Sequence, residues 1–594
     1  MKRPNYKTFS LNSGTGELLE RITDQWLLSI RATNPAILSM FRDRDVKPYR
    51  DLLPWSGEFA GKYITGAYYV YIATGRRDLY EYVRGFISEL LKYQDADGYL
   101  GCFSRQCRLT GAYSQNPDVT GLTWDCWAHY HIMFGLLLWH DAAKDAEYLK
   151  AAEKIAALFM RKFYCGKKRI VDTGSSEMNL SVFHGFCLLY SATKKREYLS
   201  FAKEIEKDLA DPGAGDYINY ALNGYEYYQC PRPRWESLHV IMGIAEMFRC
   251  TKKSIYLDVA SKIFYSCLKT DVHNTGAFST DEQAIGNPYK NGNIETCCVI
   301  AFNALASEIY RLNGDPAIID FLERSHYNAV MGYCSPSGRW STYNTPMEGT
   351  KCANYHSIVF QSRPGSPDLN CCSANAPRGV GQIVDWLITE ENNVFCINGY
   401  ENLDCETESG LKLKITGDYP YSPHVTLSVR TPQPRKIRFR IPSWSAVTLV
   451  HIGNETFSPA PGQYFSLERR WNCDVTIDFD LTPYMEKGGR DSSSYAENSG
   501  IPNLGQNTGA SYEEKYSVYC GPVLYGLQNG ENAGVDFADP PAIDRAELCK
   551  CLPEKDESGA VHLKMPGLTL TDFYHLGVDG SEYKTWFEVG GSTD

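Results

Sequence analysis

The chain has 594 residues, of which 43% are hydrophobic and 22% charged, and its formal net charge is −11. This length exceeds what one hydrophobic core can organise, so we expect two or three domains. The acidic balance argues against nucleic acid as a partner, because nucleic-acid binding needs basic surfaces. No apolar run approaches the roughly 18 residues of a membrane-spanning helix, so no membrane partner is expected either.

The first residues and the cysteine content bear on the compartment. The stretch Met1-Lys2-Arg3-Pro4 is basic but no apolar segment follows it, so it does not resemble a secretory signal. In that case the 20 cysteines are expected to be reduced thiols, some of them ligands, and not a disulfide framework. We therefore expect a cytoplasmic protein.

From about residue 14 to residue 388 the hydrophobic pattern is helical. Apolar residues recur at spacings of three and four, as in Leu18, Ile22 and Trp26. A loose repeat of about 50–65 residues consists of a helix, a short polar turn and a second helix that opens with a motif such as Asp78-Leu79-Tyr80. Such hairpins build either a solenoid or a closed ring. Their number suits a closed (α/α)6 toroid, with helices expected near 57–75, 78–95, 120–141, 146–163, 176–193, 196–210, 234–251, 253–269, 295–312, 316–331 and 373–388.

After about residue 389 apolar residues recur at every second position. Segments such as Val425-Thr426-Leu427-Ser428-Val429 alternate between apolar and polar residues and are separated by Gly, Pro and Asn turns. This pattern predicts a β-sandwich. The fold class is therefore multidomain α plus β. We expect an (α/α)6 barrel at 10–388, a β-sandwich at 389–530 with which residues 1–9 could pack, and a small β-rich region at 531–594.

One constellation of residue types indicates a metal site. Glu295 stands two residues before Cys297, and the adjacent pair Cys371-Cys372 lies downstream. Three sulfur ligands and one carboxylate favour zinc over calcium or magnesium. Both groups fall near expected helix N-termini, where the helix dipole favours thiolate and carboxylate. The alternative is that Cys297 and Cys298 face a helix core while the later pair sits in a loop.

The order of motifs around this constellation resembles a known family. The motifs are Glu295-Thr296-Cys297, Gly314-Asp315, Phe321-Leu322-Glu323-Arg324, Tyr343-Asn344, Pro346-Met347-Glu348 and Cys371-Cys372. Together they resemble glycoside hydrolase family 127, the β-L-arabinofuranosidases and their relatives. Arg440-Ile441-Pro442-Ser443-Trp444 and Gly521-Pro522-Val523-Leu524-Tyr525 also match motifs of that family's sandwich.

The resemblance implies an (α/α)6 barrel followed by β-sandwich domains, and a Zn2+ ion held by Glu295, Cys297, Cys371 and Cys372. It implies that Cys371 is the nucleophile of a retaining reaction. A glutamate before the Glu-Thr-Cys motif would be the acid/base, and we place it at Glu282, with Asp281 as the alternative. Glu323 and Tyr343 fall on positions that contact the sugar or position the nucleophile, and His131 is a further candidate for sugar binding. Without the resemblance, Glu323 would be read as a helix-surface carboxylate.

The chain also departs from the family pattern. Trp124, Asn179 and Arg234 stand where the family usually has pocket histidines or the segment His-Glu-Leu-Tyr. The metal and nucleophile positions are intact, so the reaction type is better indicated than the sugar.

We therefore expect an exo-glycosidase that releases terminal β-L-arabinofuranose from a small oligosaccharide or glycoside, and a homodimer is compatible with the sequence. One alternative is an (α/α)6 glycosidase of other specificity that uses two carboxylates and a structural zinc. Another is a non-catalytic sugar-binding protein with a zinc-stabilised scaffold.

Overall fold

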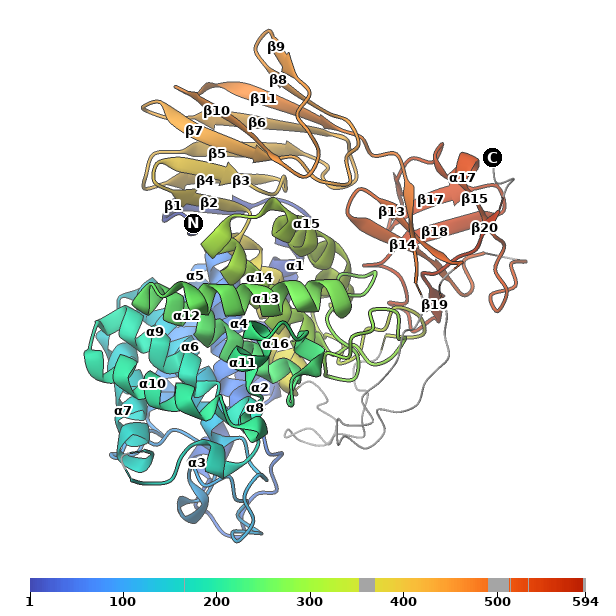
Figure 1. The fold of residues 1–594 in the computed structure, drawn as a ribbon. Helices are drawn as coiled ribbons and strands as arrows, with labels where there is room; N and C mark the ends of the chain where they lie inside the picture. The colour runs from blue at the N-terminus through green and yellow to red at the C-terminus, as the bar shows by residue number, and fades with distance from the viewer. Residues whose placement is uncertain (165, 352–368, 490–511, 513, 533, 591–594) are drawn as a thin grey trace.

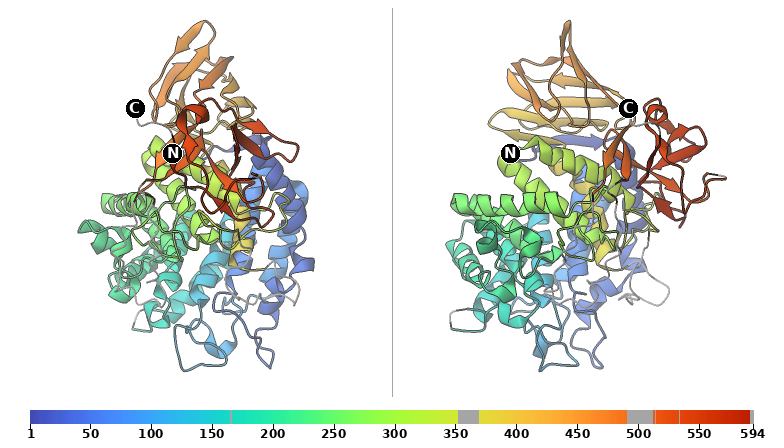
Figure 2. Two further views of the ribbon diagram at one scale, coloured as in Figure 1. Left: turned by 90° about the vertical axis from the view of Figure 1, so that its right-hand side faces the viewer. Right: turned by 45° about the vertical axis from the view of Figure 1, so that its right-hand side comes forward.

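The computed structural model describes residues 1–164, 166–351, 369–489, 512, 514–532 and 534–590. The chain forms a helical domain followed by two β-sheet regions (Figure 1). In Figures 1 and 2 the first β region lies above the helical domain, and the second lies beside both.

Six helices of the described chain pack in a closed order. Each contacts the next, and the last contacts the first; they are α4 (Glu58–Thr74), α6 (Asp125–Ala143), α9 (Val182–Thr193), α12 (Leu238–Thr251), α14 (Thr296–Asn313) and α16 (Cys371–Gly381). These helices are buried on most sides, as expected for helices surrounded by others.

Five of these inner helices pass directly to an outer helix that packs on them. The outer helices are α5 (Arg77–Leu91), α7 (Ala146–Lys162), α10 (Arg196–Asp208), α13 (Ser254–Thr270) and α15 (Pro316–Ser325). Each inner helix of these pairs ends at a residue in the left-handed conformation: Gly75, Lys144, Lys194, Lys252 or Gly314. This C-cap reverses the chain within a few residues, which explains the repeated polar turns in the sequence. The prediction of helical hairpins is confirmed.

The outer helices are amphipathic. Leu79, Val83, Phe86 and Leu90 of α5 are buried against the ring, while its other faces are more exposed. The helix α1 (Gly14–Ile22) packs on both α4 and α16. The shorter helical segments are η1 (Thr23–Leu27), α2 (Ile30–Thr33), α3 (Ala36–Arg42), η2 (Arg105–Cys107), η3 (Val171–Thr173), α8 (Ser176–Asn179), η4 (Pro212–Ala214), α11 (Tyr217–Leu222), η5 (Tyr227–Gln229), η6 (Trp235–Ser237), η7 (His326–Val330) and η8 (Gln382–Asp385).

The first β region, here called the first β-domain, comprises β1 and residues 388–479. Its seven-stranded sheet has the order β1 (Tyr6–Leu11), β4 (Leu403–Thr407), β5 (Lys412–Gly417), β6 (His424–Arg430), β11 (Asn472–Phe479), β8 (Thr448–Ile452) and β9 (Glu455–Phe457). Its four-stranded sheet has the order β10 (Tyr464–Arg469), β7 (Arg435–Arg440), β3 (Val394–Ile397) and β2 (Ile388–Glu391). Val425, Leu427 and Val429 of β6 are buried, and the residues between them are partly exposed, as the alternation predicts. The N-terminal strand β1 pairs with β4, so the start of the chain belongs to this domain.

The second β-domain spans residues 484–590 in the described chain. Its main sheet runs β12 (Tyr484–Lys487), β13 (Tyr516–Cys520), β14 (Val523–Gln528), β18 (Leu568–Asp572), β17 (Val561–Met565) and β16 (Glu554–Lys555), with β19 (Tyr583–Lys584) paired to β14. The helix α17 (Arg545–Leu548) and the short pair β15 (Ile543–Asp544) and β20 (Val589–Gly590) complete it. The expected boundary at residue 530 is wrong, because it separates β14 from its partner β18; the sheets divide between β11 and β12 instead.

No helix in the described ranges is both long and apolar enough to cross a membrane.

Candidate metal centre and acid/base loop

Two helix N-termini bring the predicted ligands together. Glu295 is the N-cap residue of α14, and Cys297 lies in the first turn of that helix. Cys371 and Cys372 are the first two residues of α16 and do not lie ahead of it. Asn370 caps α16 by accepting a hydrogen bond from the backbone N–H of Ser373. Because α14 and α16 pack against each other, their first turns lie side by side.

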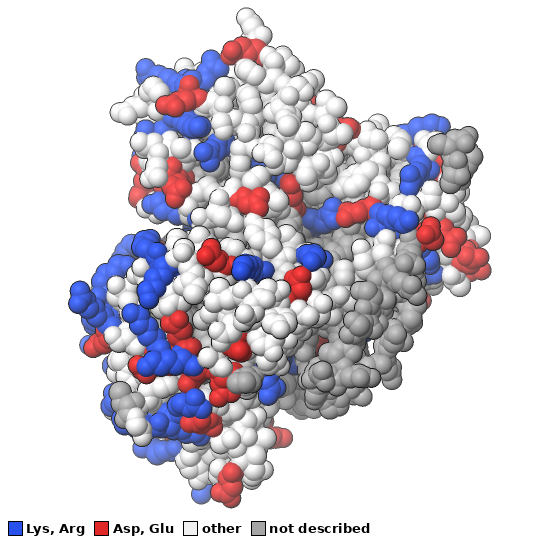
Figure 3. Space-filling view, in the orientation of Figure 1, with Lys and Arg blue, Asp and Glu red and all other residues white. Residues whose placement is uncertain are grey.

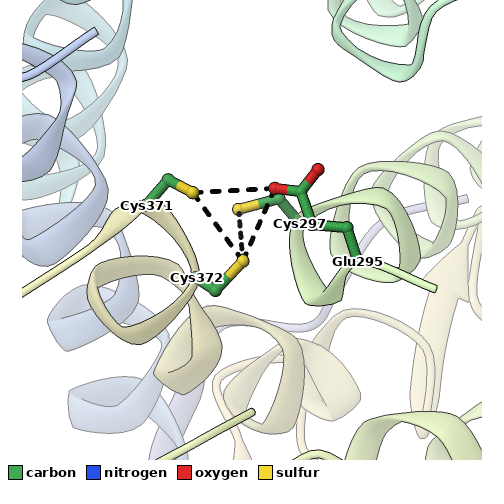
Figure 4. Close-up of side chains that lie close together, drawn as sticks. All are labelled: Glu295, Cys297, Cys371 and Cys372. Atoms are coloured by element: carbon green, nitrogen blue, oxygen red, sulfur yellow. Dashed lines mark hydrogen bonds between the residues drawn. The ribbon is translucent and has the colours of Figure 1, made fainter. Parts of the chain in front are cut away.

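The four side chains point toward one another (Figure 4). Their ligand atoms all lie within 4.8 Å of one another. Glu295 Oε1 is 3.6 Å from Cys371 Sγ and 3.5 Å from Cys372 Sγ, and Cys372 Sγ is 3.7 Å from Cys297 Sγ. Cys371 is 8% exposed, whereas Glu295 is 2% exposed and Cys297 and Cys372 are fully buried. This cluster could hold a metal ion, and Cys371 is its most accessible member.

The electrostatics of the cluster fit a cation. Burial, and next the charge of Glu282, raise the pKa of Glu295 well above its usual value. The hydrogen bond to Cys297 raises the pKa of Cys371, and burial raises that of Cys372. Four buried acidic groups at these distances cannot all ionise unless a positive charge lies among them. A soft divalent cation would supply that charge, and three sulfurs with one carboxylate are ligands that suit zinc.

A buried ion pair borders the cluster and was not predicted. Lys62 Nζ lies 3.5 Å from Cys297 Sγ and 2.9 Å from Glu58 Oε1. The indole N–H of Trp127 donates to the other oxygen of Glu58, and Asn375 Nδ2 lies 3.6 Å from Cys297 Sγ. Donors around a ligand sulfur orient it and stabilise its thiolate. The sequence contains one signal that could have predicted this ion pair: Glu58 and Lys62 stand four residues apart in a helix that is otherwise largely apolar or aromatic.

The segment before α14 carries the expected acid/base residue. Glu282 adopts a positive φ of 67°, and its carboxylate accepts a hydrogen bond of 2.5 Å from the Tyr343 hydroxyl. Arg234 forms an ion pair with its other oxygen. Asp281 points to different partners, Lys290 at 3.0 Å and the side chain of Asn293 at 3.0 Å. Of the two alternatives, Glu282 is therefore the one that is hydrogen-bonded to Tyr343.

Arg234 lies between two acidic side chains. Besides Glu282 it binds Glu236, with Nε 2.8 Å from Oε2. Burial raises the pKa of Glu236 to about 8, so this carboxyl is largely protonated at neutral pH. Arg234 also lies over the ring of Trp124, with Cζ 5.9 Å from the centroid. Arg234, a position that departs from the family pattern, thus fixes the carboxyl of Glu282, the predicted acid/base residue.

The remaining predicted pocket residues lie in different surroundings. His131 is buried and its ring is 4.3 Å from Trp127, but neither ring nitrogen has a hydrogen-bond partner among the described residues. Burial lowers the pKa of His131 well below its usual value, so the ring is neutral. Asn179 has a structural role: its side chain accepts from the backbone of Trp127 at 3.3 Å and donates to Gly174 O at 2.8 Å.

Glu323 does not join the cluster. Its carboxylate accepts hydrogen bonds from Arg440 Nη2 at 2.5 Å, from Trp444 Nε1 at 3.1 Å and from the Tyr419 hydroxyl. All three donors belong to the first β-domain, and Glu323 is 1% exposed. Since both oxygens are occupied in a domain interface, we do not propose a sugar contact for this residue. The alternative of a helix-surface carboxylate also fails, because the side chain is buried.

Comparison with known proteins decides the family. The model of the β-L-arabinofuranosidase GH127 catalytic domain matches residues 29–385, and that of the GH127 middle domain matches residues 395–482. The chain belongs to glycoside hydrolase family 127. It is therefore a glycoside hydrolase of the β-L-arabinofuranosidase-like type, and the resemblance seen in the sequence is confirmed.

Solved structures agree in fold. A GH127 β-arabinofuranosidase has a TM-score of 0.75 and 18% identity, with 99% of this chain and 98% of that chain covered. A GH127 β-L-arabinofuranosidase from Geobacillus stearothermophilus T6 has a TM-score of 0.74 and 16% identity, with 98% and 100% covered. Because the sequence identities are this low, these structural matches show a shared fold and nothing further. No curated protein sequence matches the chain at a significant level.

Proposed function

We propose that this GH127 enzyme is a retaining exo-glycosidase with a cysteine nucleophile, and that its closed ring of helices is an (α/α)6 barrel. The observation that carries the proposal is the buried Glu295, Cys297, Cys371 and Cys372 cluster, of which Cys371, at 8%, is the most exposed member. The proposed substrate is a small glycoside with a terminal β-L-arabinofuranose, the sugar named for the family's models.

The same four residues would hold Zn2+. When bound, the ion would compensate their negative charge and favour the thiolate forms of the cysteines. Lys62 and Asn375, which lie against Cys297, would keep that ligand oriented.

The proposed reaction has two steps. The Cys371 sulfur attacks the anomeric carbon, the glycosidic C–O bond breaks, and Glu282 donates its proton to the leaving oxygen. The sugar is then bonded to Cys371 as a thioglycoside. In the second step the Glu282 carboxylate takes a proton from water, whose oxygen attacks the same carbon and releases the Cys371 thiolate. Two displacements at one carbon return the original anomeric configuration.

Tyr343 and Arg234 have positioning roles in this scheme. The Tyr343 hydroxyl and the Arg234 guanidinium hold the two oxygens of Glu282. Arg234 also stabilises the negative charge that Glu282 bears once it has given its proton to the leaving oxygen.

The test combines metal analysis with product stereochemistry. We expect about one zinc per chain in reduced, purified protein. We also expect hydrolysis of p-nitrophenyl β-L-arabinofuranoside, with the β-anomer appearing first by NMR. An α-anomer as the first product would support the two-carboxylate alternative with a structural zinc. Bound zinc without turnover of any aryl glycoside would support the alternative of a non-catalytic sugar-binding protein. Absence of zinc would reject the proposed metal centre.

A further inference from the structure

A cleft lies where the three domains meet. It has a volume of about 300 Å³ and is lined by His273, Tyr289 and Arg324 of the helical domain, Trp444 of the first β-domain, and Glu486 and Trp586 of the second. Neither the four cluster residues nor Glu282 line it. In Figure 1 its walls come from the region where α13, α15 and β13 approach one another. Domain junctions are preferred places for small-molecule sites, and this volume suits one or two sugar units.

One wall of the cleft presents a fixed, neutral ion pair. Arg324 Nη2 lies 2.8 Å from Glu486 Oε2, and their side chains are 29% and 48% exposed. The guanidinium also lies over the ring of Tyr519, with Cζ 4.6 Å from the centroid. In the view of Figure 3, acidic and basic side chains lie close together where the three domains meet. The charges of this pair balance, and the other charged lining residues, Lys269, Lys487 and Asp320, pair with Glu226, Glu514 and Arg440. These groups therefore suit the hydroxyls of a neutral ligand better than an ion.

The other walls supply aromatic surface. Trp444 and Tyr289 are half-buried and come from different domains. The Tyr289 ring lies 6.2 Å from that of Trp586, which is almost completely buried and supports it. Rigid aromatic faces beside charged hydrogen-bonding groups combine an apolar platform with directional polar contacts. A saccharide has both matching surfaces, the C–H face of its ring and the hydroxyls at its edge.

The cleft is also built on the segment that carries Glu282. His273 and Tyr289 lie near the two ends of the segment between α13 and α14. His273 connects the start of this segment to its later part, since Nδ1 lies 2.7 Å from Pro288 O. It also contacts the middle of the segment, where Nε2 lies 3.1 Å from Thr280 Oγ1. A ligand in the cleft would therefore contact residues that hold the acid/base segment in place.

We propose that this cleft is a second saccharide-binding site, which takes one or two units of a neutral oligosaccharide. The choice of a saccharide rests on the proposed glycosidase function. The existence of the cleft and the identity of its lining residues do not depend on that function.

The experiment compares the full-length protein with two cleft variants and one control. Ser443→Trp places a large ring in the cleft from an exposed position that lines it, and Tyr289→Ala removes one platform. Tyr225→Ala removes a tyrosine that is 54% exposed and does not line the cleft. Each protein is titrated calorimetrically with arabinobiose, xylobiose, galactobiose and cellobiose up to about 10 mM, a range that detects millimolar binding.

For wild type and the Tyr225 control we expect one of these disaccharides to bind at a site that Ser443→Trp abolishes and Tyr289→Ala weakens about tenfold or more. Hydrolysis of a small aryl glycoside should persist in Ser443→Trp. Binding unchanged in both cleft variants, or no binding by any of the four disaccharides, would overturn the proposal. If the cleft site exists but the protein hydrolyses no glycoside, the proposed function fails and the site stands. If hydrolysis occurs without the second site, only this inference fails.

Discussion

Arg440 of β7 lies against Glu323 of α15, with Nη2 2.5 Å from Oε1. The two side chains are 0% and 1% exposed, and Arg440 also forms an ion pair with Asp320. This contact joins the helical domain to the first β-domain. It assigns the Arg-Ile-Pro-Ser-Trp motif at 440–444 a structural role, since Trp444 binds the same carboxylate.

Replacing Glu323 by alanine should destabilise the protein without removing its chemistry. The substitution leaves the buried Arg440 with an incomplete set of partners, which typically costs about 3–5 kcal/mol. Thermal unfolding of Glu323→Ala should therefore begin at a clearly lower temperature, while the specific activity of the folded fraction at low temperature stays near that of wild type. Glu455→Ala, which removes an exposed partner of Arg469, is the matched control and should change little. Inactive Glu323→Ala with unchanged thermal stability would show that Glu323 acts in catalysis instead.

Replacing Cys371 by alanine should abolish turnover. If this sulfur forms the bond to the sugar, its loss should lower kcat by about 10⁴-fold or more, as for other nucleophiles. Cys298→Ala is the control, because that thiol lies next to the cluster, 3.7 Å from Glu295 Oε2, but is not one of its four ligands. The control should retain zinc and most of the activity. A Cys371→Ala enzyme that matches wild type would exclude the cysteine nucleophile.

The helical hairpins were predictable because their signals are local. A period of 3.6 and a left-handed C-cap involve residues close in sequence, so the paired helices follow from the hydrophobic pattern alone. Helix starts were less accurate: the helix expected at 120–141 begins at Asp125, and that expected at 176–193 is divided into α8 and α9. Boundaries depend on capping contacts that a hydrophobic period does not contain.

The features that escaped prediction depend on distant partners. Lys62 lies 235 residues from Cys297, and Glu323 lies 117 residues from Arg440, so no local pattern pairs them. The domain boundary near residue 480 was missed for a similar reason. The alternation of apolar and polar residues predicts strands but not which strands pair. β14 pairs with β18, which lies about 45 residues later in the sequence.

The stability of the protein should depend on pH through Glu236. Burial raises the pKa of this carboxyl from an ordinary 4.5 to about 8, so the folded protein keeps a proton that the unfolded chain releases. Stability should therefore fall as pH rises from about 4.5 to about 8, by up to about 1.4 kcal/mol per pH unit. When thermal unfolding is measured between pH 4.5 and pH 8, the stability of Glu236→Gln should change less with pH than that of wild type. An equal pH dependence in both proteins would mean that Glu236 is ionised in the fold.

The choice between Glu282 and Asp281 as the acid/base can be made with leaving groups. Glu282→Gln should lose about 10²–10⁴-fold in rate on glycosides with poor leaving groups, which need a proton donor. Its first step should be much less affected with 2,4-dinitrophenolate, a leaving group that departs unprotonated. Added azide should restore the second step, since this anion attacks without general-base help.

Asp281→Asn is the matched variant, because it changes the neighbouring carboxylate. The contacts of Asp281 with Lys290 and Asn293 hold the segment between α13 and α14. This variant should therefore lower stability or the overall rate by a similar factor for every leaving group, and azide should not rescue it. The opposite pattern, with leaving-group dependence and azide rescue in Asp281→Asn, would transfer the acid/base role to Asp281. It would then leave Glu282, between Tyr343 and Arg234, as a residue that shapes the pocket.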